Sequence, residues 1–541
     1  MTLVAQYNVG DYGAVGDGTT DDTTAIKNAI SACGTAGGGI VYFPAGTYKV
    51  TSAVATPAQS TGYMILRGAG RGATKIAGTA SGVTLLTLQM PGEVTDMTID
   101  GGGSAVNTLG LLTTGTIAIS SMAVRRCDIG GISTSSGMWT LVAWDQGSLF
   151  QIDTLYLEDV ELYGPTNNAL DAMSVTYVDK CFVNNMRMTG LARTPNFFII
   201  NHLFVDGLTV IGCGTTNSPL VIDSSVKHAH LSHVYVDDTN SGGVGVWLEC
   251  PDVTFSDSAL LCGVGGGYGT TYPRWKFINC DIPHGLALEG GGVGSLEITG
   301  GQIGYLANAI TDYSPAGTVH GPIRITGATL ASTGNNIIFR SFNGTTVSEL
   351  VVADCQGFSP GRSFSDGVLT SGSPTLTSAS AKFSSADVGR KIEDTTGSGV
   401  IAVGTTITTV NSATSVTLSA NATGNATKDL CSMAGLDLTL TPTSATTIGT
   451  PGRSYVRGVT GYNPVGSVTV TVPASGTAVA AVLYDRTFYV TAAATGTTTV
   501  AVSGGPTLTL PASSLVAVRV PAGTTLTPTY TAAPTWKVEG E

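Results

Sequence analysis

The chain has 541 residues, a formal net charge of −12 and 11% charged residues, less than half of the roughly 25% usual in globular proteins. This balance excludes a nucleic-acid-binding surface, because phosphate recognition needs a clustered basic face. No run of eighteen apolar residues occurs, so we expect no membrane insertion. A surface so poor in charge indicates that other subunits cover part of it.

The first fifty residues predict a short helix followed by a strand. Apolar residues recur at helical spacing at Ala25, Ile26, Ala29, Ile30 and Cys33. Asp21 or Asp22 is placed to accept amides of the first turn. A glycine run, 37–39, ends the helix, and the alternation that follows predicts a half-buried strand. Such a helix would plug the open end of a stack of strands.

The order and spacing of residues 11–22 (Asp-Tyr-Gly-Ala-Val-Gly-Asp-Gly-Thr-Thr-Asp-Asp) and 37–48 (Gly-Gly-Gly-Ile-Val-Tyr-Phe-Pro-Ala-Gly-Thr-Tyr) resemble a known N-terminal cap. This is the cap of pectate-lyase-like right-handed parallel β-helix proteins, which include phage tailspikes and polysaccharide-degrading enzymes. The resemblance implies an all-β chain: a right-handed parallel β-helix with an N-terminal capping helix, followed by small antiparallel β domains. We expect the cap over 1–50 and the β-helix over 51–365.

A quartet pattern recurs from about residue 95 to 356, at steps of 21 to 33 residues, and predicts stacked coils. The quartets are 126–129, 159–162, 185–188, 207–210, 233–236, 257–260, 279–282, 300–303 and 327–330. Their first residue is mostly Asn, Asp or Gly, which tolerate the left-handed conformation of a sharp corner. Their second and fourth residues should point inward, with Cys127, Val160, Met186, Leu208, Val234 and Cys280 in one column. Their third residues should form a ladder that faces solvent.

The nine cysteines show no metal-ligand spacing, and several occupy core positions of this pattern. We interpret them as reduced and buried. Reduced cysteines indicate folding in a reducing cytoplasm, and the sequence shows no signal-peptide pattern. Both features fit a virion protein that is released by lysis. Four aspartates at 11, 17, 21 and 22 suit turns and a helix start better than a metal site. We expect no metal and no cofactor.

Two sets of carboxylates could do chemistry. Asp128 and Glu161 should lie on successive rungs, at a spacing that suits a retaining glycosidase, with Arg187 on the next rung. A charge-balancing ladder is the simpler interpretation. The second set contains Asp171, Asp237, Asp238 and Glu249. Its adjacent aspartates, 237 and 238, faintly resemble the paired aspartates of polygalacturonase-like hydrolases, although the order of that family's motifs is not matched. The candidate catalytic residues are Asp128, Glu161, Asp171, Asp237, Asp238 and Glu249.

Aromatic residues in the longer connections suit the flat faces of sugars, although such rings also pack loops and subunit interfaces. The candidate substrate-binding residues are Trp139, Trp144, Arg187, Tyr235, Tyr268, Tyr272 and Trp275. A lyase would also need a cation for a uronate carboxylate, for which Arg187, Arg193 and Lys180 are the nearby candidates. By elimination, hydrolysis is favoured over lysis.

The C-terminal third changes to Thr, Ser, Ala and Val in two-residue alternation near residue 366. Residues 384–391 resemble a small β module of phage tail fibres, which we place at 366–432. Strands at 487–490, 498–502 and 515–520 predict an antiparallel, sandwich-like domain over 433–541, for trimerisation or receptor binding. The segment 533–536 resembles the ending of minor tail proteins.

Together these features predict a homotrimeric phage tailspike or receptor-binding tail protein that recognises host cell-surface polysaccharide on its β-helix flank. Whether it also depolymerises that polysaccharide stays open. We expect contacts with other phage tail proteins or an adaptor. The alternatives are a non-catalytic adhesin or structural tail protein, and a free bacterial polysaccharide lyase.

Overall fold

The computed structural model describes residues 5–105, 107–113, 117–132, 139–145, 152–164, 171–190, 193–213, 218–237, 245–266, 272–304, 309–330, 339–340, 345–357, 362–383, 392–394, 400–402, 405–433, 447–448, 455–457, 472–480, 486–521 and 524–540. The fold is nearly all β, with a parallel β-solenoid of about ten turns and small antiparallel sheets later in the chain. The predicted fold class is therefore confirmed. The chain divides into two compact units, one made of 1–276 with 280–282 and the other of 277–279 with 283–541.

The first unit begins with the predicted cap. It holds β1 (Gln6–Asn8), the 3-10 helix η1 (Val9–Tyr12), β2 (Asp17–Asp21), α1 (Thr23–Thr35), β3 (Gly38–Phe43), β4 (Gly46–Val50) and β5 (Val54–Ala55). The five apolar residues predicted for one face of α1 are all buried, and Gly34 approaches Pro57 so closely that a side chain would collide with it. The helix thus packs on the first coil, as a cap should.

The aspartates of the cap bind backbone and hydroxyl groups. Asp21 Oδ1 accepts from the Thr23 amide at 3.0 Å, at the start of α1. Asp22 turns the other way and accepts from the amides of Val15 and Gly16. Asp17 accepts from two amides in its own turn. Local backbone geometry accounts for these three carboxylates.

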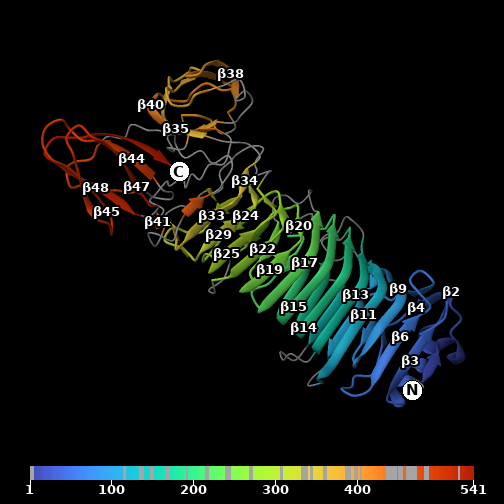
Figure 1. Ribbon diagram of the computed structural model, residues 1–541. Coiled ribbons are helices and arrows are strands. Elements are labelled where there is room, and N and C mark those ends of the chain that lie inside the picture. The colour runs from blue at the N-terminus through green and yellow to red at the C-terminus, as the bar shows by residue number, and fades with distance from the viewer. Residues whose placement is uncertain are drawn as a thin grey trace. The chain divides into compact units, whose positions relative to one another are not determined.

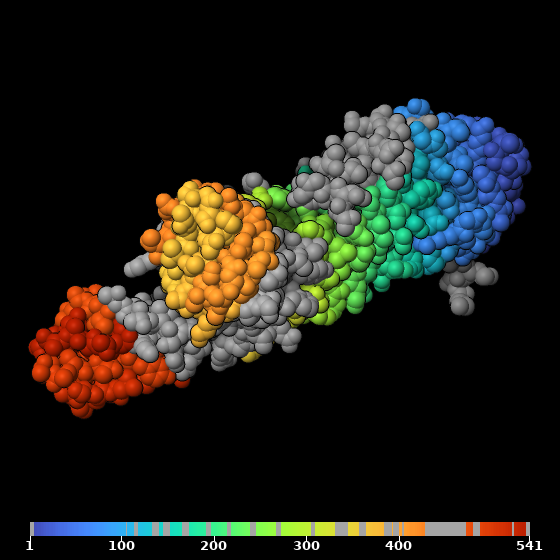
Figure 2. Space-filling model, turned by 90° about the horizontal axis from the view of Figure 1, so that it is seen from above, coloured from blue at the N-terminus to red at the C-terminus, as the bar shows by residue number. Residues whose placement is uncertain are grey.

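The solenoid strands of the first unit run side by side in Figure 1, and Figure 2 shows this unit, blue to green, as an elongated body. They are β6 (Tyr63–Gly68), β7 (Thr74–Gly78), β8 (Thr84–Leu88), β9 (Gly92–Ala105), β10 (Asn107–Thr113), β11 (Ile119–Ile132), β12 (Trp139–Asp145), β13 (Ile152–Tyr163), β14 (Asp171–Thr189), β15 (Arg193–Ile211), β16 (Val221–Ile222), β17 (His228–Asp237), β18 (Val246–Leu248), β19 (Asp252–Ser256), β20 (Ala259–Leu260), β21 (Val264–Gly266), β23 (Asp281–Ile282) and the first three residues of β22 (Arg274–Ile278). Neighbouring strands in this set pair in parallel.

The quartets mark a corner of each coil. All nine first positions have positive φ, from 48° to 79°, including Arg126 and His233, whose side chains do not favour that conformation. The predicted inward column is buried, with Cys127, Val160 and Met186 each no more than 1% exposed. Each of these three is the direct partner of the next on adjacent strands. Both predictions are confirmed.

The second unit contains further solenoid strands: β24 (Leu286–Leu288), β25 (Ser295–Thr299), β26 (Gln302–Ile303), β27 (Ile310–Asp312), β28 (Val319–His320), β29 (Ile323–Thr326), β30 (Thr329–Leu330), β31 (Phe339–Arg340), β32 (Thr346–Val347), β33 (Leu350–Ala353), β34 (Gln356–Gly357), β41 (Thr447–Ile448) and β42 (Tyr455–Arg457). Strand β42 pairs in parallel with β33, and β41 with β32. The solenoid therefore resumes inside the segment that the sequence assigned to the C-terminal domain, and the antiparallel module between β34 and β41 is an insertion.

That module has its own apolar core around Phe364, Leu376 and Val416. Its strands are β35 (Arg362–Leu369), β36 (Thr375–Thr377), β37 (Ile392–Asp394), β38 (Ile407–Ser412), β39 (Ser415–Leu418) and β40 (Ala426–Met433). The last domain packs around Phe488 and Trp536. It holds β43 (Val479–Ala480), β44 (Arg486–Thr491), β45 (Thr498–Val502), β46 (Thr507–Leu510), β47 (Leu515–Val520), β48 (Thr525–Tyr530) and β49 (Thr535–Gly540), all paired antiparallel.

Candidate functional site

A groove of about 450 Å³ lies on the outer face of the first unit, on the strand segments that precede the corner. Its floor is a row of rings from four successive coils: Tyr156, Phe182, Phe204 and His230. Each ring lies three residues before a corner residue, so the corner brings them into register. We call these four side chains the ring row.

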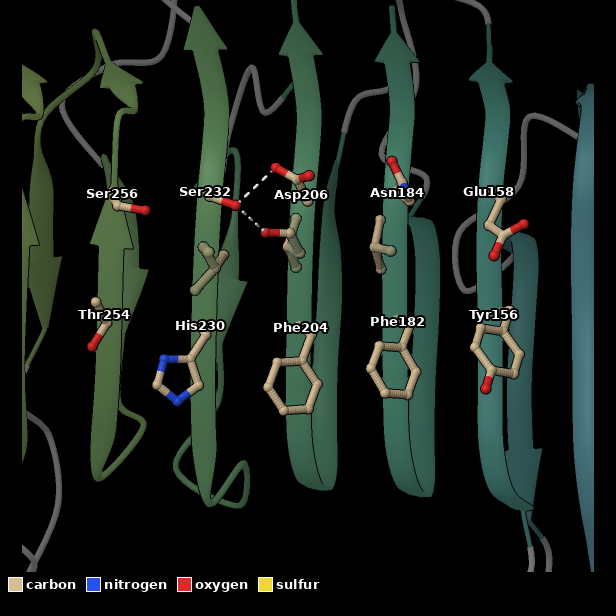
Figure 3. Close-up of a pocket in the computed structure, with 13 residues that line it drawn as sticks. Tyr156, Glu158, Phe182, Asn184, Phe204, Asp206, His230, Ser232, Thr254 and Ser256 are labelled. Atoms are coloured by element: carbon tan, nitrogen blue, oxygen red, sulfur yellow. Dashed lines mark hydrogen bonds between the residues drawn. The ribbon is translucent and has the colours of Figure 1, made fainter.

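The rings of the row are nearly parallel to their neighbours. Centroids are 5.3 Å apart between Tyr156 and Phe182, 5.1 Å between Phe182 and Phe204, and 5.8 Å between Phe204 and His230, with interplanar angles of 11° to 14°. Figure 3 shows their faces turned outward from the sheet. Because coplanar rings would collide at these distances, neighbouring rings overlap, and they form a stacked apolar strip that crosses the strands, with Phe204 still 37% exposed.

A polar row runs beside the ring row, one residue before each corner (Figure 3). Its members, from coil to coil, are Glu158, Asn184, Asp206, Ser232 and Ser256. Carboxylate oxygens accept hydrogen bonds, while amide and hydroxyl groups both accept and donate. The groove therefore offers flat apolar contact on one side and hydrogen bonds on the other.

The two carboxylates of the polar row are held by specific partners. Glu158 Oε2 accepts from Arg125 Nε at 2.6 Å, and the same guanidinium also pairs with Glu93. Asp206 Oδ1 accepts from the Ser232 hydroxyl at 2.8 Å and lies 2.7 Å from His233 Nδ1. Hydrogen bonds from His233 and Ser232 hold the pKa of the Asp206 carboxyl below its usual range, so Asp206 is ionised at neutral pH.

The first predicted pair lies beyond the corner. Asp128 and Glu161 are direct partners on β11 and β13, and Arg187 follows on β14, as predicted from the ladder. Arg71 Nε is 3.1 Å from Asp128 Oδ1, at an angle that makes it an ion pair rather than a hydrogen bond. Arg187 Nε is 3.8 Å from Glu161. Two arginines therefore balance the two carboxylates, in a row of partly exposed side chains: Arg71, Asp128, Glu161 and Arg187.

The second predicted set divides between strands that do not pair. Asp237 ends β17, which pairs with β15, β19 and β20, and it lies 3.3 Å from the Tyr235 hydroxyl. Glu249 follows β18, which pairs with β16 and β21, and accepts from Trp247 Nε1 at 2.9 Å. Asp238 and the side chain of Asp171 lie outside the described residues, although the Asp171 backbone pairs with Trp139 and Arg193.

The predicted sugar-binding rings lie in different environments. Trp275 lies in the core, 1% exposed, so its interpretation as a surface ring was wrong. The cause is its place in β22, where Trp275 and Phe277 alternate inward between Arg274 and Lys276. Tyr272 is 60% and Tyr235 37% exposed, and neither lines the groove. Tyr268 and the side chains of Trp139 and Trp144 lie outside the described residues.

The sequence interpretation missed the ring row. Its signal was available, because an aromatic or histidine residue stands three positions before four successive corners. The quartet pattern covers the residues from each corner onward, whereas the rings precede the corner. In the described part of the chain, no group of three or more His, Cys, Asp or Glu side chains is arranged to hold a metal ion. Nor does that part contain a helix of the length and apolarity needed to span a bilayer.

Residues 6–231 match the family described as rhamnogalacturonase A/epimerase, pectate lyase-like, which confirms the predicted resemblance for that part of the chain. A segment of 110 residues, 18% of this chain, is 44% identical to mannuronan C5-epimerase AlgE6 of Azotobacter vinelandii, and it covers 12% of that protein. The chain therefore spans a small part of the curated relatives that it matches.

Solved structures with a similar fold include polysaccharide-epimerase modules and phage tailspikes. The A-module of AlgE6 from Azotobacter vinelandii is 19% identical, with a TM-score of 0.36, over 65% of this chain and 93% of that one. Tailspike gp49 of Acinetobacter baumannii bacteriophage Fri1, a capsular polysaccharide depolymerase, is 10% identical, with a TM-score of 0.32, over 99% of this chain and 85% of that one.

Proposed function

We propose that this chain is a phage tail protein of the tailspike type, which binds a host cell-surface polysaccharide in the groove of its solenoid. The observation that carries this proposal is the ring row. A tail protein that meets the cell surface first needs a binding face that accepts an extended glycan, and the groove crosses several coils. The resemblance of the cap and the similarity of the fold to tailspikes support the same assignment.

The geometry of the row suits sugar rings. Successive coils are about 4.8 Å apart, which is close to the advance of one hexopyranose along an extended chain. The apolar faces of such sugars can lie on outward ring faces, while their hydroxyl groups reach the polar row. A glycan lying along the solenoid axis would meet one ring and one polar group per coil.

Cleavage is a second candidate function. Glu158 and Asp206 are two coils apart, or about 9.6 Å between backbones, near the upper end of the spacing of about 6.5 to 9.5 Å in inverting glycosidases. Ionised Asp206 could serve as a base toward water. A general acid must release a proton, however, whereas Glu158 accepts a hydrogen bond from Arg125. Binding is therefore the primary proposal, and hydrolysis by Glu158 and Asp206 the secondary one.

The pair Asp128 and Glu161 stays a proposal of lower rank. Adjacent rungs give the separation of about 5 Å that retaining glycosidases use. Both carboxylates already have guanidinium partners, and neither lines the groove. If cleavage occurs without any effect of Glu158→Gln or Asp206→Asn, this pair is the next to be replaced.

Purified protein incubated with host surface polysaccharide tests the proposal. Retention without new reducing ends identifies an adhesin, new reducing ends identify a hydrolase, and ends that carry an unsaturated uronate absorbance identify a lyase. Failure to retain the surface polysaccharide of any susceptible host would refute binding. Absence of the chain from purified virions, measured by mass spectrometry, would refute the tail assignment.

The proposed assembly is a homotrimer, in which partner subunits cover part of the charge-poor surface. Light scattering after size-exclusion chromatography should then give three times the chain mass of 54.9 kDa. A monomer mass at micromolar concentration would contradict this assembly without affecting the groove.

A further inference from the structure

The groove is acidic. Among its thirteen described lining residues, Glu158 and Asp206 are the two carboxylates. No lysine or arginine is among the described residues of this lining. Both carboxylates lie in the polar row, where the hydroxyl and other polar groups of a bound glycan would come (Figure 3).

The cations near the groove are already balanced. Arg125, at one end of the ring row, lies between two carboxylates, those of Glu93 and Glu158. Its guanidinium carbon is 5.6 Å from the centre of the Tyr156 ring. Arg125 therefore brings one positive charge to two negative ones and leaves a net negative charge at that end.

Two further basic side chains on this face, Lys180 and His233, also have carboxylate partners. Lys180 contacts Asp153 at 3.2 Å and Asp179 at 3.1 Å. The His233 imidazole is hydrogen-bonded to the Asp206 carboxylate, which raises the pKa of His233. A positive charge on His233 is therefore already paired with Asp206. None of these groups is left over to receive an anionic substituent of a ligand.

From this arrangement we infer that the groove selects glycans without acidic groups, and that Glu158 and Asp206 exclude polyuronates. This inference rests on the proposed function, and it names the substrate class of the same site. A uronate polymer would bring one carboxylate per sugar alongside the polar row. Two like charges about 6 Å apart in water weaken binding roughly threefold, so two such contacts multiply to about tenfold.

The test uses mannuronan oligosaccharides at pH 8 and low salt, where uronates are ionised and their repulsion by carboxylates is least screened. The double variant Glu158→Gln, Asp206→Asn keeps the size and one acceptor oxygen of each side chain, and it removes both charges. We expect the variant to bind mannuronan about tenfold more tightly than the unaltered chain. Because salt screens the repulsion, this difference should shrink at 0.5 M NaCl.

A control variant separates the groove from net charge. Glu297→Gln with Glu349→Gln removes two carboxylates that also have an arginine partner, Arg324, in the second unit. This variant should bind mannuronan as the unaltered chain does. Circular dichroism checks that all variants keep their β content.

The outcomes distinguish this inference from the function on which it rests. If the unaltered chain binds mannuronan as tightly as the groove variant does, or if neither binds it, the two carboxylates do not exclude polyuronates and the inference is overturned. Retention of host polysaccharide and its loss on truncation of the ring row do not depend on that result. They decide the proposed function separately.

Discussion

Replacing Phe204 by alanine removes the central contact of the ring row, and the structure sets the size of the effect. A phenylalanine side chain has about 200 Å² of surface to bury, and the exposed 37% of Phe204 leaves about 70 Å² for a sugar. At about 25 cal/mol per Å², full coverage of that area contributes about 1.8 kcal/mol, or a factor of about twenty in the dissociation constant. We therefore expect Phe204→Ala to weaken polysaccharide binding by up to about twentyfold.

The variant should still fold, because the inward neighbours Leu203 and Val205 keep their places in the core. Loss of the ring contacts with Phe182 and His230 lowers the free energy of unfolding by about 1–3 kcal/mol. Binding is measured by isothermal titration with the polysaccharide that the chain retains. The matched control is Tyr313→Ala, which removes a ring that is 64% exposed and outside the groove. Unchanged affinity in Phe204→Ala, with its fold intact, would refute the assignment of the ring row.

Three further predictions concern the solenoid. Asn185 has φ of +50° at a corner, so Asn185→Ala should lower the free energy of unfolding by about 1–2 kcal/mol, whereas Asn185→Gly should cost less; denaturant titration followed by circular dichroism compares the two. Cys181 is fully buried, so Cys181→Ser should destabilise by about 1–3 kcal/mol in the same assay, because a hydroxyl replaces a thiol in the core. Burial would raise the pKa of Asp312, but hydrogen bonds from His320 and the Ser314 amide outweigh it and hold that pKa below its ordinary value. A carboxyl group whose pKa is lower in the folded chain than in the unfolded chain stabilises the fold at any pH above its unfolded pKa of about 3.9. This stabilisation is lost as the pH falls through the folded pKa. Asp312→Ala should thus lower stability by about 3–5 kcal/mol at pH 7 and by progressively less below pH 4, measured by hydrogen exchange of β27 and β28. A constant difference between pH 7 and pH 3 would contradict the role of its charge.

The coil pattern could be predicted because every coil repeats the same steric problem. A sharp corner needs a positive φ, and residues that tolerate it recur at the first quartet position often enough to be seen. Arg126 and His233 were placed at corners by their position alone, and both have the predicted conformation. The alternation that follows each corner then fixed the inward column and the register of Asp128 with Glu161.

The order of the C-terminal segments could not be predicted in the same way. Strands β41 and β42 are two and three residues long, too short to show a period, and an antiparallel module of about seventy residues separates them from the coils on which they pack. Only pairing in space shows that the solenoid resumes after the insertion. The error at Trp275 was different, because the alternation from Arg274 to Phe277 already indicated an inward ring.

The ring row ends after four coils, and this limited length favours a role in ligand binding over a role in stabilising the fold. An outward ring on a coil contributes less burial than an inward one, and small residues satisfy the same sheet position on both sides of the row: Ala123 pairs with Tyr156, and Thr254 pairs with His230. If stacking along the solenoid were the purpose of these rings, nothing in the coil geometry would end it after four rungs. A binding site for a short stretch of glycan has a natural length, and the groove, which is lined by the ring row and by Thr254, has that limited extent. Extending the row by Thr254→Tyr should accordingly change affinity for longer oligosaccharides and leave that for the shortest bound one unaltered.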